Sequence, residues 1–342
     1  MALACFFVSP ARADKLDDYV REQMQARHIP GLSLVVVRDG KIVKAQSYGL
    51  ANVELNAPAT NESVFEIGSI TKQLTATAVM LLVEEGKIKL DERIDAYLSD
   101  AHPPDAWNAV TVRHLLTHTS GIKTYTGLPG FEFSRHLKKE EFVKALSTFP
   151  LDFQPDEKWA YSNSGYNLLG FILEKASGEP YWEFMAERIY KPLGMTATRD
   201  RNPVPTVKGR VAGYEWKNNA WINRDADLTD IFSAGATIST ALDLAKWDAA
   251  LNTERLLKKS SLEQIWTPIR LNDGKTYPYG FGWDVESLNG HKLISHGGQT
   301  AGFSASIARY VDDKLTIIVL CNLGDIGVAG KVRQGIAALL QK

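Results

Sequence analysis

The chain has 342 residues, of which 44% are hydrophobic and 23% are charged. This is the composition of a globular protein with enough residues for a large core, and it excludes a disordered or low-complexity chain. The 39 basic residues nearly balance the 40 acidic ones, so charge does not indicate a nucleic-acid partner or an anionic membrane surface. No apolar stretch reaches the ~18 residues that a membrane-spanning helix needs, so we expect no integral membrane segment.

The first residues, MALACFFVSPARAD, place a short apolar run before an Ala-Arg-Ala triplet. An apolar run followed by an A-x-A site is typical of the end of a secretory signal, although the basic segment that normally begins one is missing. We therefore expect residues 1–13 to be a truncated signal segment. We expect the protein to be periplasmic or secreted, with a cytoplasmic location as the alternative. Removal of Cys5 with that segment would leave Cys321 alone, so cysteine content does not decide the compartment.

Strand patterns gather at the two ends of the chain. After a helix pattern over residues 14–27, two apolar runs flank Asp39-Gly40, and Asp-Gly between such runs indicates a β-hairpin. A second hairpin pattern lies around Asp312-Asp313, and a final helix is expected at about 327–341. The simplest architecture brings both ends of the chain together in one antiparallel sheet.

The middle of the chain has helical patterns. The segment 70–85 has the pattern of a buried helix, the segment 162–178 has helical apolar spacing and ends in glycine, and Thr240 is a suitable N-cap for a further helix. We predict an α+β fold, in the form of an α/β/α sandwich, in which helices flank the antiparallel sheet and an all-helical lobe is inserted.

The predicted boundaries follow from these patterns. A single domain, 14–342, would consist of a sheet lobe (14–65 and 280–342) and a mainly helical lobe (66–279). A cleft between two such lobes is a common place for a ligand to bind.

The segment GSITKQ places Ser69 and Lys72 three residues apart, at the start of the apolar helix pattern. This spacing brings both side chains to one face of a helix. A serine hydroxyl needs a neighbour that takes its proton, and a desolvated lysine can do so. The alternative is that Ser69 caps the helix and Lys72 extends to solvent.

Two further segments contain polar groups suited to the same chemistry. Tyr161 and Asn163 precede a helix pattern, and a tyrosine near a cation can transfer protons. His296, Gly297 and Gly298 precede an apolar strand pattern, where glycines allow the backbone to approach a ligand closely. The alternatives are a polar turn with a helix cap in the first case and a glycine-rich turn in the second.

Taken together and in this order, the motifs resemble those of the serine beta-lactamase-like, or penicillin-recognising, hydrolases. This family includes the class C beta-lactamases, the D-amino-acid peptidases and the family VIII carboxylesterases. Its S-x-x-K, Y-x-N and K/H-x-G elements match residues 69–72, 161–163 and 296–298. The segments FEIGSITKQLTA, LLTHTSGI, AGATISTALDLAKW and YGFGW are also similar to the family. The resemblance covers nearly the whole chain from about residue 15.

The resemblance implies acyl transfer through an acyl-enzyme on Ser69, without a metal or organic cofactor. Lys72 and Tyr161 would share the proton transfers as a coupled pair, with Tyr161 as general base and then as acid toward the leaving group. Asn163 would orient Lys72 and the substrate. The backbone N–H groups of Ser69 and Gln299 would form the oxyanion hole.

One departure from the family pattern bears on the substrate. Beta-lactamases usually have K-T-G at the third element, whereas this chain has His296-Gly297-Gly298. A histidine is largely neutral near pH 7, so a fixed cation for a substrate carboxylate is lost or depends on pH. We therefore expect a small ester, or an amide or peptide with D-residues, ahead of a beta-lactam.

Functions of other kinds remain as alternatives. The chain could be an efficient class C-type beta-lactamase, a catalytically silent protein that binds penicillin or peptidoglycan, or a scaffold that retains the motifs. His114 and His118 have the i, i+4 spacing of zinc ligands. However, no H-E-x-x-H motif occurs and no third ligand is evident, so we expect no metal site. The G-x-S-x-G motif of α/β-hydrolases is also absent.

Overall fold

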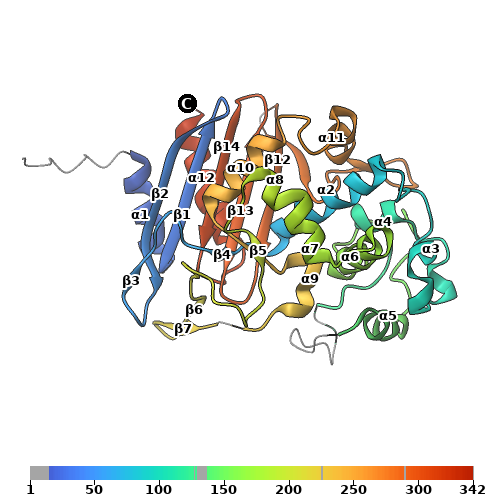
Figure 1. Ribbon diagram of the computed structural model, residues 1–342. Coiled ribbons are helices and arrows are strands. Elements are labelled where there is room, and N and C mark those ends of the chain that lie inside the picture. The colour runs from blue at the N-terminus through green and yellow to red at the C-terminus, as the bar shows by residue number, and fades with distance from the viewer. Residues whose placement is uncertain (1–14, 127, 129–136, 225, 289, 342) are drawn as a thin grey trace, which may run out of the picture.

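The computed structural model describes residues 15–126, 128, 137–224, 226–288 and 290–341 (Figure 1). The expected signal segment 1–13 lies outside the described residues. Within the described part of the chain, no helix is both long enough and apolar enough to cross a bilayer.

A seven-stranded antiparallel sheet, in the order β11-β12-β13-β14-β1-β2-β3, is the centre of the fold. Its strands are β1 (Gly31–Arg38), β2 (Lys41–Asn52), β3 (Ala57–Pro58), β11 (Asp284–Leu288), β12 (His291–Gln299), β13 (Ser304–Tyr310) and β14 (Leu315–Cys321). β1 pairs with β14, from Leu32 opposite Cys321 to Arg38 opposite Leu315. Both predicted hairpins are present, as β1–β2 and β13–β14, and the predicted fold class is confirmed.

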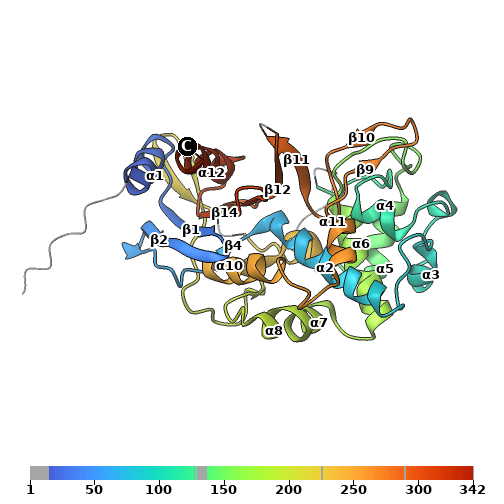
Figure 2. The same cartoon turned by 90° about the horizontal axis from the view of Figure 1, so that it is seen from above.

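Helices cover both faces of the sheet, because its central strands are apolar on both faces. In β1, Leu34 belongs to one cluster of buried side chains, and the next residue, Val35, belongs to another on the opposite face. Helices α1 (Lys15–Ala26) and α12 (Val328–Leu340) cover the first face, and α10 (Ala241–Ala250) covers the second (Figure 2). The sheet is therefore the middle layer of a sandwich.

The mainly helical part of the molecule is built around α2 (Thr71–Glu84), which packs against α6 (Asn163–Ser177) and α9 (Phe232–Gly235). Helix α2 is buried on every side from Thr71 to Leu82. A helix enclosed in this way has no solvent-facing stripe through which a charged side chain could reach water. Lys72 is therefore inside the protein.

The remaining elements are short. The helices are α3 (Asp95–Leu98), α4 (Val112–Leu116), α5 (Lys139–Ser147), α7 (Tyr181–Met185), α8 (Lys191–Leu193) and α11 (Lys259–Ile265). The strands are β4 (Phe65–Glu66), β5 (Arg199–Asp200), β6 (Tyr214–Lys217), β7 (Ala220–Asn223), β8 (Thr237–Ser239), β9 (Ile269–Arg270) and β10 (Thr276–Tyr277).

Helix α10 returns from the helical part of the chain to the sheet, where it packs on β1 and β14. The hydroxyl of Thr240 accepts a hydrogen bond of 3.0 Å from the backbone N–H of Asp243, so the predicted N-cap is confirmed. The division into lobes at residues 65/66 and 279/280 stays a prediction.

Candidate active site

Ser69 lies in a 3₁₀ turn, Gly68–Ile70, that leads directly into α2. Gly68 has a φ of +51°, and a Cβ atom there would lie 2.6 Å from the backbone nitrogen of Gln299. Only glycine therefore allows the turn to approach the end of β12 so closely. The turn brings Ser69 to the boundary between helices and sheet, where it is half-buried in the wall of a cleft.

Lys72 is fully buried one turn after Ser69. Its Nζ lies 3.1 Å from Ser69 Oγ, 2.7 Å from Asn163 Oδ1 and 2.7 Å from the carbonyl oxygen of Ala234. The two carbonyl oxygens can only accept, whereas the serine hydroxyl can also donate. Within the described part of the chain, no carboxylate forms a salt bridge with Lys72.

Burial lowers the pKa of Lys72 well below its usual value, because desolvation disfavours the ammonium. A neutral amine has two N–H donors and one lone pair. Directed at Asn163 and Ala234, the two donors leave the lone pair for the hydroxyl proton of Ser69. This is the proton that must leave when a serine acts as a nucleophile.

Tyr161 and Asn163 flank Ser162, whose hydroxyl caps the N-terminus of α6. The ring centroid of Tyr161 lies 4.7 Å from Lys72 Nζ. Burial raises the pKa of Tyr161, and a hydrogen bond with Ser69 only partly opposes this effect. The phenol is therefore protonated near neutral pH. The fold brings together the side chains of both motifs.

His296 lies on β12 and is buried. Its Nε2 lies 3.0 Å from the hydroxyl of Tyr279, and its Nδ1 lies 2.5 Å from the carbonyl oxygen of Gly297. Burial lowers the pKa of His296 to about 4, because desolvation disfavours the imidazolium. The imidazole is thus neutral at pH 7, and both of its nitrogens already have partners within the protein.

The three residues after His296 differ in how tightly they are constrained. A Cβ atom on Gly298 would lie 1.9 Å from the carbonyl oxygen of Ile67, so this position requires glycine. The nearest atom to a Cβ on Gly297 is 3.8 Å away, which is an ordinary contact. Gln299 lines the cleft, and its buried Oε1 has no hydrogen-bond partner among the described residues.

The cleft has a volume of about 980 Å³ and extends from Ser69 to the loops around Arg224 and Asp325. Among the residues that the structure describes, its charged lining consists of one guanidinium, Arg224, and three carboxylates, Glu215, Asp227 and Asp325. Arg224 forms an ion pair of 3.1 Å with Glu215. The wall of the cleft is therefore net negative.

Three residues of the site were not found from the sequence. Ala234 contributes only its carbonyl oxygen, which no residue type signals. Tyr166 places its ring centroid 5.4 Å from Lys72 Nζ, but its helical position predicts only core packing. Tyr279 lies in the segment YGFGW, which could have directed attention to it.

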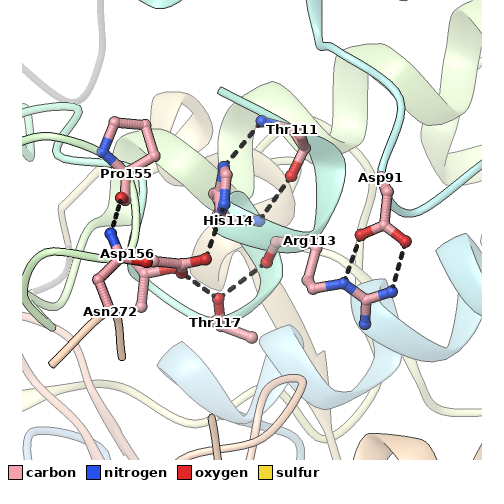
Figure 3. Close-up of polar contacts among 9 residues, drawn as sticks. Asp91, Thr111, Arg113, His114, Thr117, Pro155, Asp156 and Asn272 are labelled. Carbon is pink, nitrogen blue, oxygen red and sulfur yellow. Dashed lines mark hydrogen bonds and ion pairs between the residues drawn. The ribbon is translucent and has the colours of Figure 1, made fainter. Parts of the chain in front are cut away.

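His114 and His118 do not share a helical face, because α4 ends at Leu116. His114 Nδ1 accepts a hydrogen bond of 3.0 Å from the backbone N–H of Thr111, and its Nε2 lies 3.0 Å from Asp156 Oδ2 (Figure 3). It serves as part of a capping box for α4. Among the described side chains, no group of three His, Cys, Asp or Glu residues could hold a metal ion.

The sandwich fold and the cluster of Ser69, Lys72 and Tyr161 define a protein of the serine beta-lactamase-like class. A family model described as Beta-lactamase matches residues 16–341, and the chain belongs to this family.

Known relatives agree with this assignment. The chain is 32% identical to a penicillin-binding protein of Bacillus subtilis (strain 168), over 88% of this chain and 70% of the relative. It is 26% identical to a D-aminopeptidase of Gluconobacter oxydans (strain 621H), over 86% of this chain and 56% of that protein. An octameric penicillin-binding protein homologue from Pyrococcus abyssi has a similar structure, with a TM-score of 0.83 and 31% identity over 96% of this chain and 77% of that one.

Proposed function

We propose that this protein is a serine hydrolase that cleaves esters or amides through an acyl-enzyme on Ser69. The observation that carries the proposal is the 3.1 Å contact between Ser69 Oγ and the buried Nζ of Lys72. That nitrogen is buried and has no ion pair with any of the described residues, which supports a role as proton acceptor. A lysine needed only for stability would gain more from a carboxylate partner.

The proton transfers follow from the two pKa directions. Lys72, as a neutral amine, takes the proton of Ser69 while Oγ attacks the carbonyl carbon. Tyr161, which burial keeps protonated, gives its proton to the leaving group and is reprotonated from Lys72. We therefore propose Lys72 as the first base, whereas the sequence-based expectation gave that step to Tyr161. The two groups titrate as a coupled pair.

Other parts of the site support binding of the reacting carbonyl. We propose that the backbone N–H groups of Ser69 and Gln299 form the oxyanion hole. The close approach of Gly68 to Gln299 supports this arrangement. Loss of one such donor typically costs ~3 kcal/mol of transition-state stabilisation. Asn163 holds Lys72 through its Oδ1.

We propose that the preferred substrates lack a carboxylate near the scissile bond. The neutral His296 supplies no cation at pH 7, and the net negative wall of the cleft repels anions. Both features favour neutral esters, or amides of D-amino acids with a free amino group. Beta-lactams, which have a carboxylate, come third. The D-aminopeptidase among the relatives is consistent with this order.

The test is a panel of substrates with Ser69→Ala beside each: p-nitrophenyl acetate and butyrate, nitrocefin, a D-amino-acid p-nitroanilide and a D-Ala-D-Ala peptide. We expect Ser69→Ala to abolish turnover of the ester or of the anilide, without loss of folding. Turnover that survives in this variant would refute the proposal. Strong nitrocefin turnover would instead identify a beta-lactamase.

A silent penicillin- or peptidoglycan-binding protein is the main alternative. It would give a stoichiometric adduct on Ser69 in an intact-mass measurement, with no turnover of any substrate in the panel.

A further inference from the structure

We infer that His118, Tyr279 and His296 form a directed chain of hydrogen bonds that positions the catalytic groups and occupies the His296 ring. The catalytic part of this inference rests on the proposed function. The direction of the chain depends only on which atoms donate and which accept.

The first end of the chain lies at Ser162. The backbone N–H of Ser162 donates to His118 Nδ1 at 3.1 Å. An amide N–H can only donate, so Nδ1 of His118 is unprotonated and the ring proton is on Nε2. Nε2 lies 3.2 Å from the hydroxyl of Tyr279 and donates to it. Burial lowers the pKa of His118 well below its usual value, because desolvation disfavours the imidazolium, and this keeps the ring neutral.

The other end of the chain lies at Gly297. Its carbonyl oxygen, 2.5 Å from His296 Nδ1, can only accept, so Nδ1 has the ring proton. Nε2 of a neutral His296 then accepts the proton of the Tyr279 hydroxyl, 3.0 Å away. Tyr279 thus accepts one hydrogen bond and donates one. All four bonds point from Ser162 toward Gly297.

Tyr166 is the one competitor among the described residues for the Tyr279 proton. Its hydroxyl also interacts with that of Tyr279, and it donates its own proton to the carbonyl oxygen of Leu116 at 2.8 Å. If Tyr279 donated to Tyr166, His296 would need a proton on each nitrogen. A buried imidazolium near Lys72 is unfavourable, which the pKa of about 4 reflects. The proton of Tyr279 therefore belongs to His296 near neutral pH.

The titratable groups around the chain come from several elements. Lys72 faces it from α2, Tyr161 and Tyr166 from the start of α6, and Asp284 from β11. Burial raises the pKa of Asp284 to about 6. Rings enclose His118, with centroids 4.4 Å away at Tyr161 and 5.8 Å away at Trp159.

This chain has two consequences for the site. It starts between Tyr161 and Asn163 and ends on β12, so it ties the helical side of the site to the sheet side. It also uses both ring nitrogens of His296, so the imidazole offers a substrate no free donor. His118 and Tyr279 are therefore positioning residues, and the occupied His296 sets specificity against substrate carboxylates.

The first test measures which ring nitrogen is protonated in each histidine. We would record long-range ¹H–¹⁵N spectra of the full-length protein with ¹⁵N-labelled histidine at pH 7, and assign signals with His118→Asn and His296→Asn. We expect His118 as the Nε2–H tautomer and His296 as the Nδ1–H tautomer. The opposite tautomer at either ring, or a doubly protonated ring, would overturn the inference.

The second test removes the central hydroxyl. Tyr279→Phe keeps the aromatic ring but leaves His118 without an acceptor and His296 without a donor. Both histidine signals should shift. The matched control is Tyr277→Phe, because Tyr277 stacks on Trp159 at 4.1 Å and takes no part in the chain. Unchanged histidine signals in Tyr279→Phe would contradict the proposed chain of hydrogen bonds. If this variant does not fold, the tautomers measured in the wild-type protein are sufficient to test the inference.

The third test separates positioning from simple stabilisation through the pH profile of kcat/KM on p-nitrophenyl butyrate. We expect Tyr279→Phe to lower kcat about tenfold or more. We also expect the acidic limb of the pH profile of this variant to move to higher pH, because His296 protonates more easily without the hydrogen bond from Tyr279. Tyr277→Phe should leave kcat and the acidic limb unchanged. An unaltered profile in Tyr279→Phe would exclude the positioning role. If the wild type turns over no substrate, the proposed function fails, but the histidine tautomers still test the proposed chain of hydrogen bonds.

Discussion

The cleft and the interface between α10 and the sheet each bury a basic side chain, but the two regions surround it differently. Arg309, on β13, lies 2.7 Å from Asp248 Oδ1, and Thr316 donates to the same carboxylate oxygen at 3.0 Å. Among the residues that the structure describes, the hydrogen-bond partners of Lys72 Nζ are the neutral oxygens of Ser69, Asn163 and Ala234.

This difference separates a charge-compensated cation from an amine that favours its neutral form. A buried charge is stable when a carboxylate compensates it, as at Arg309. Without that compensation the favourable response is loss of the proton, as at Lys72. The two regions thus favour different protonation states of a buried basic group: the charged form at Arg309 and the neutral form at Lys72.

The largest expected effect is at the cleft. Lys72→Met should lower turnover about 10³-fold or more, because the proton acceptor for Ser69 is lost. Stability should be unchanged or higher, because a desolvated amine is replaced by an apolar side chain. Steady-state kinetics and thermal melting measure the two effects. Lys191→Met, at an exposed lysine paired with Glu187, is the control. Turnover within tenfold of the wild type would contradict the role of Lys72.

The second effect is at the α10 interface. Asp248→Asn should lower the free energy of unfolding by about 3–5 kcal/mol, because it leaves the buried charge of Arg309 without a compensating carboxylate, although the hydrogen bond to Asn252 remains. Urea titration measures this change. The kcat/KM of the folded variant should match that of the wild type. A loss below 1 kcal/mol would show that Arg309 does not depend on Asp248.

The third effect is the acid sensitivity of stability near the cleft. Folding lowers the pKa of His296 from 6.5 to about 4. The neutral imidazole therefore makes its full contribution to the free energy of unfolding above pH 6.5, and this contribution is lost as the pH falls toward 4. Because each pKa unit corresponds to about 1.36 kcal/mol, the full loss of unfolding free energy is about 3 kcal/mol. Urea titrations from pH 7 to pH 4 should show a shallower decline for His296→Asn. Equal slopes in the two proteins would refute this assignment.

The smallest effect concerns the helix that contains Asp248. Thr240→Ala removes the N-cap of α10 and should cost about 1 kcal/mol of unfolding free energy. Thr240→Ser keeps a capping hydroxyl and should lose less. Thermal melting of the three proteins compares them, and equal losses in both variants would argue against capping.

Much of the fold could be predicted from short-range pattern. Asp39-Gly40 marked the hairpin β1–β2, and apolar runs marked the helices α2 and α6. Such signals depend on a few neighbouring residues, so they can be recognised without knowledge of the fold. The return of α10 to the sheet left no comparable signal, because its apolar residues fit any buried surface.

The candidate site divides in the same way. Ser69, Lys72, Tyr161 and Asn163 lie in recognisable motifs, and the structure brings them together. The carbonyl of Ala234, which is 162 positions from Lys72, could not be predicted, since backbone oxygens look alike in every residue.

The pairing of β1 with β14 has a consequence for the order in which the protein forms. Ser69 and its helix are synthesised long before β12 to β14, yet the end of β12 packs against the turn that holds Ser69. Contacts between such distant parts of a chain form slowly, and strands without partners are exposed in the meantime. The growing polypeptide therefore has Ser69 but not the complete candidate site until the last strands arrive. If the proposed function holds, activity requires these last strands to be in place.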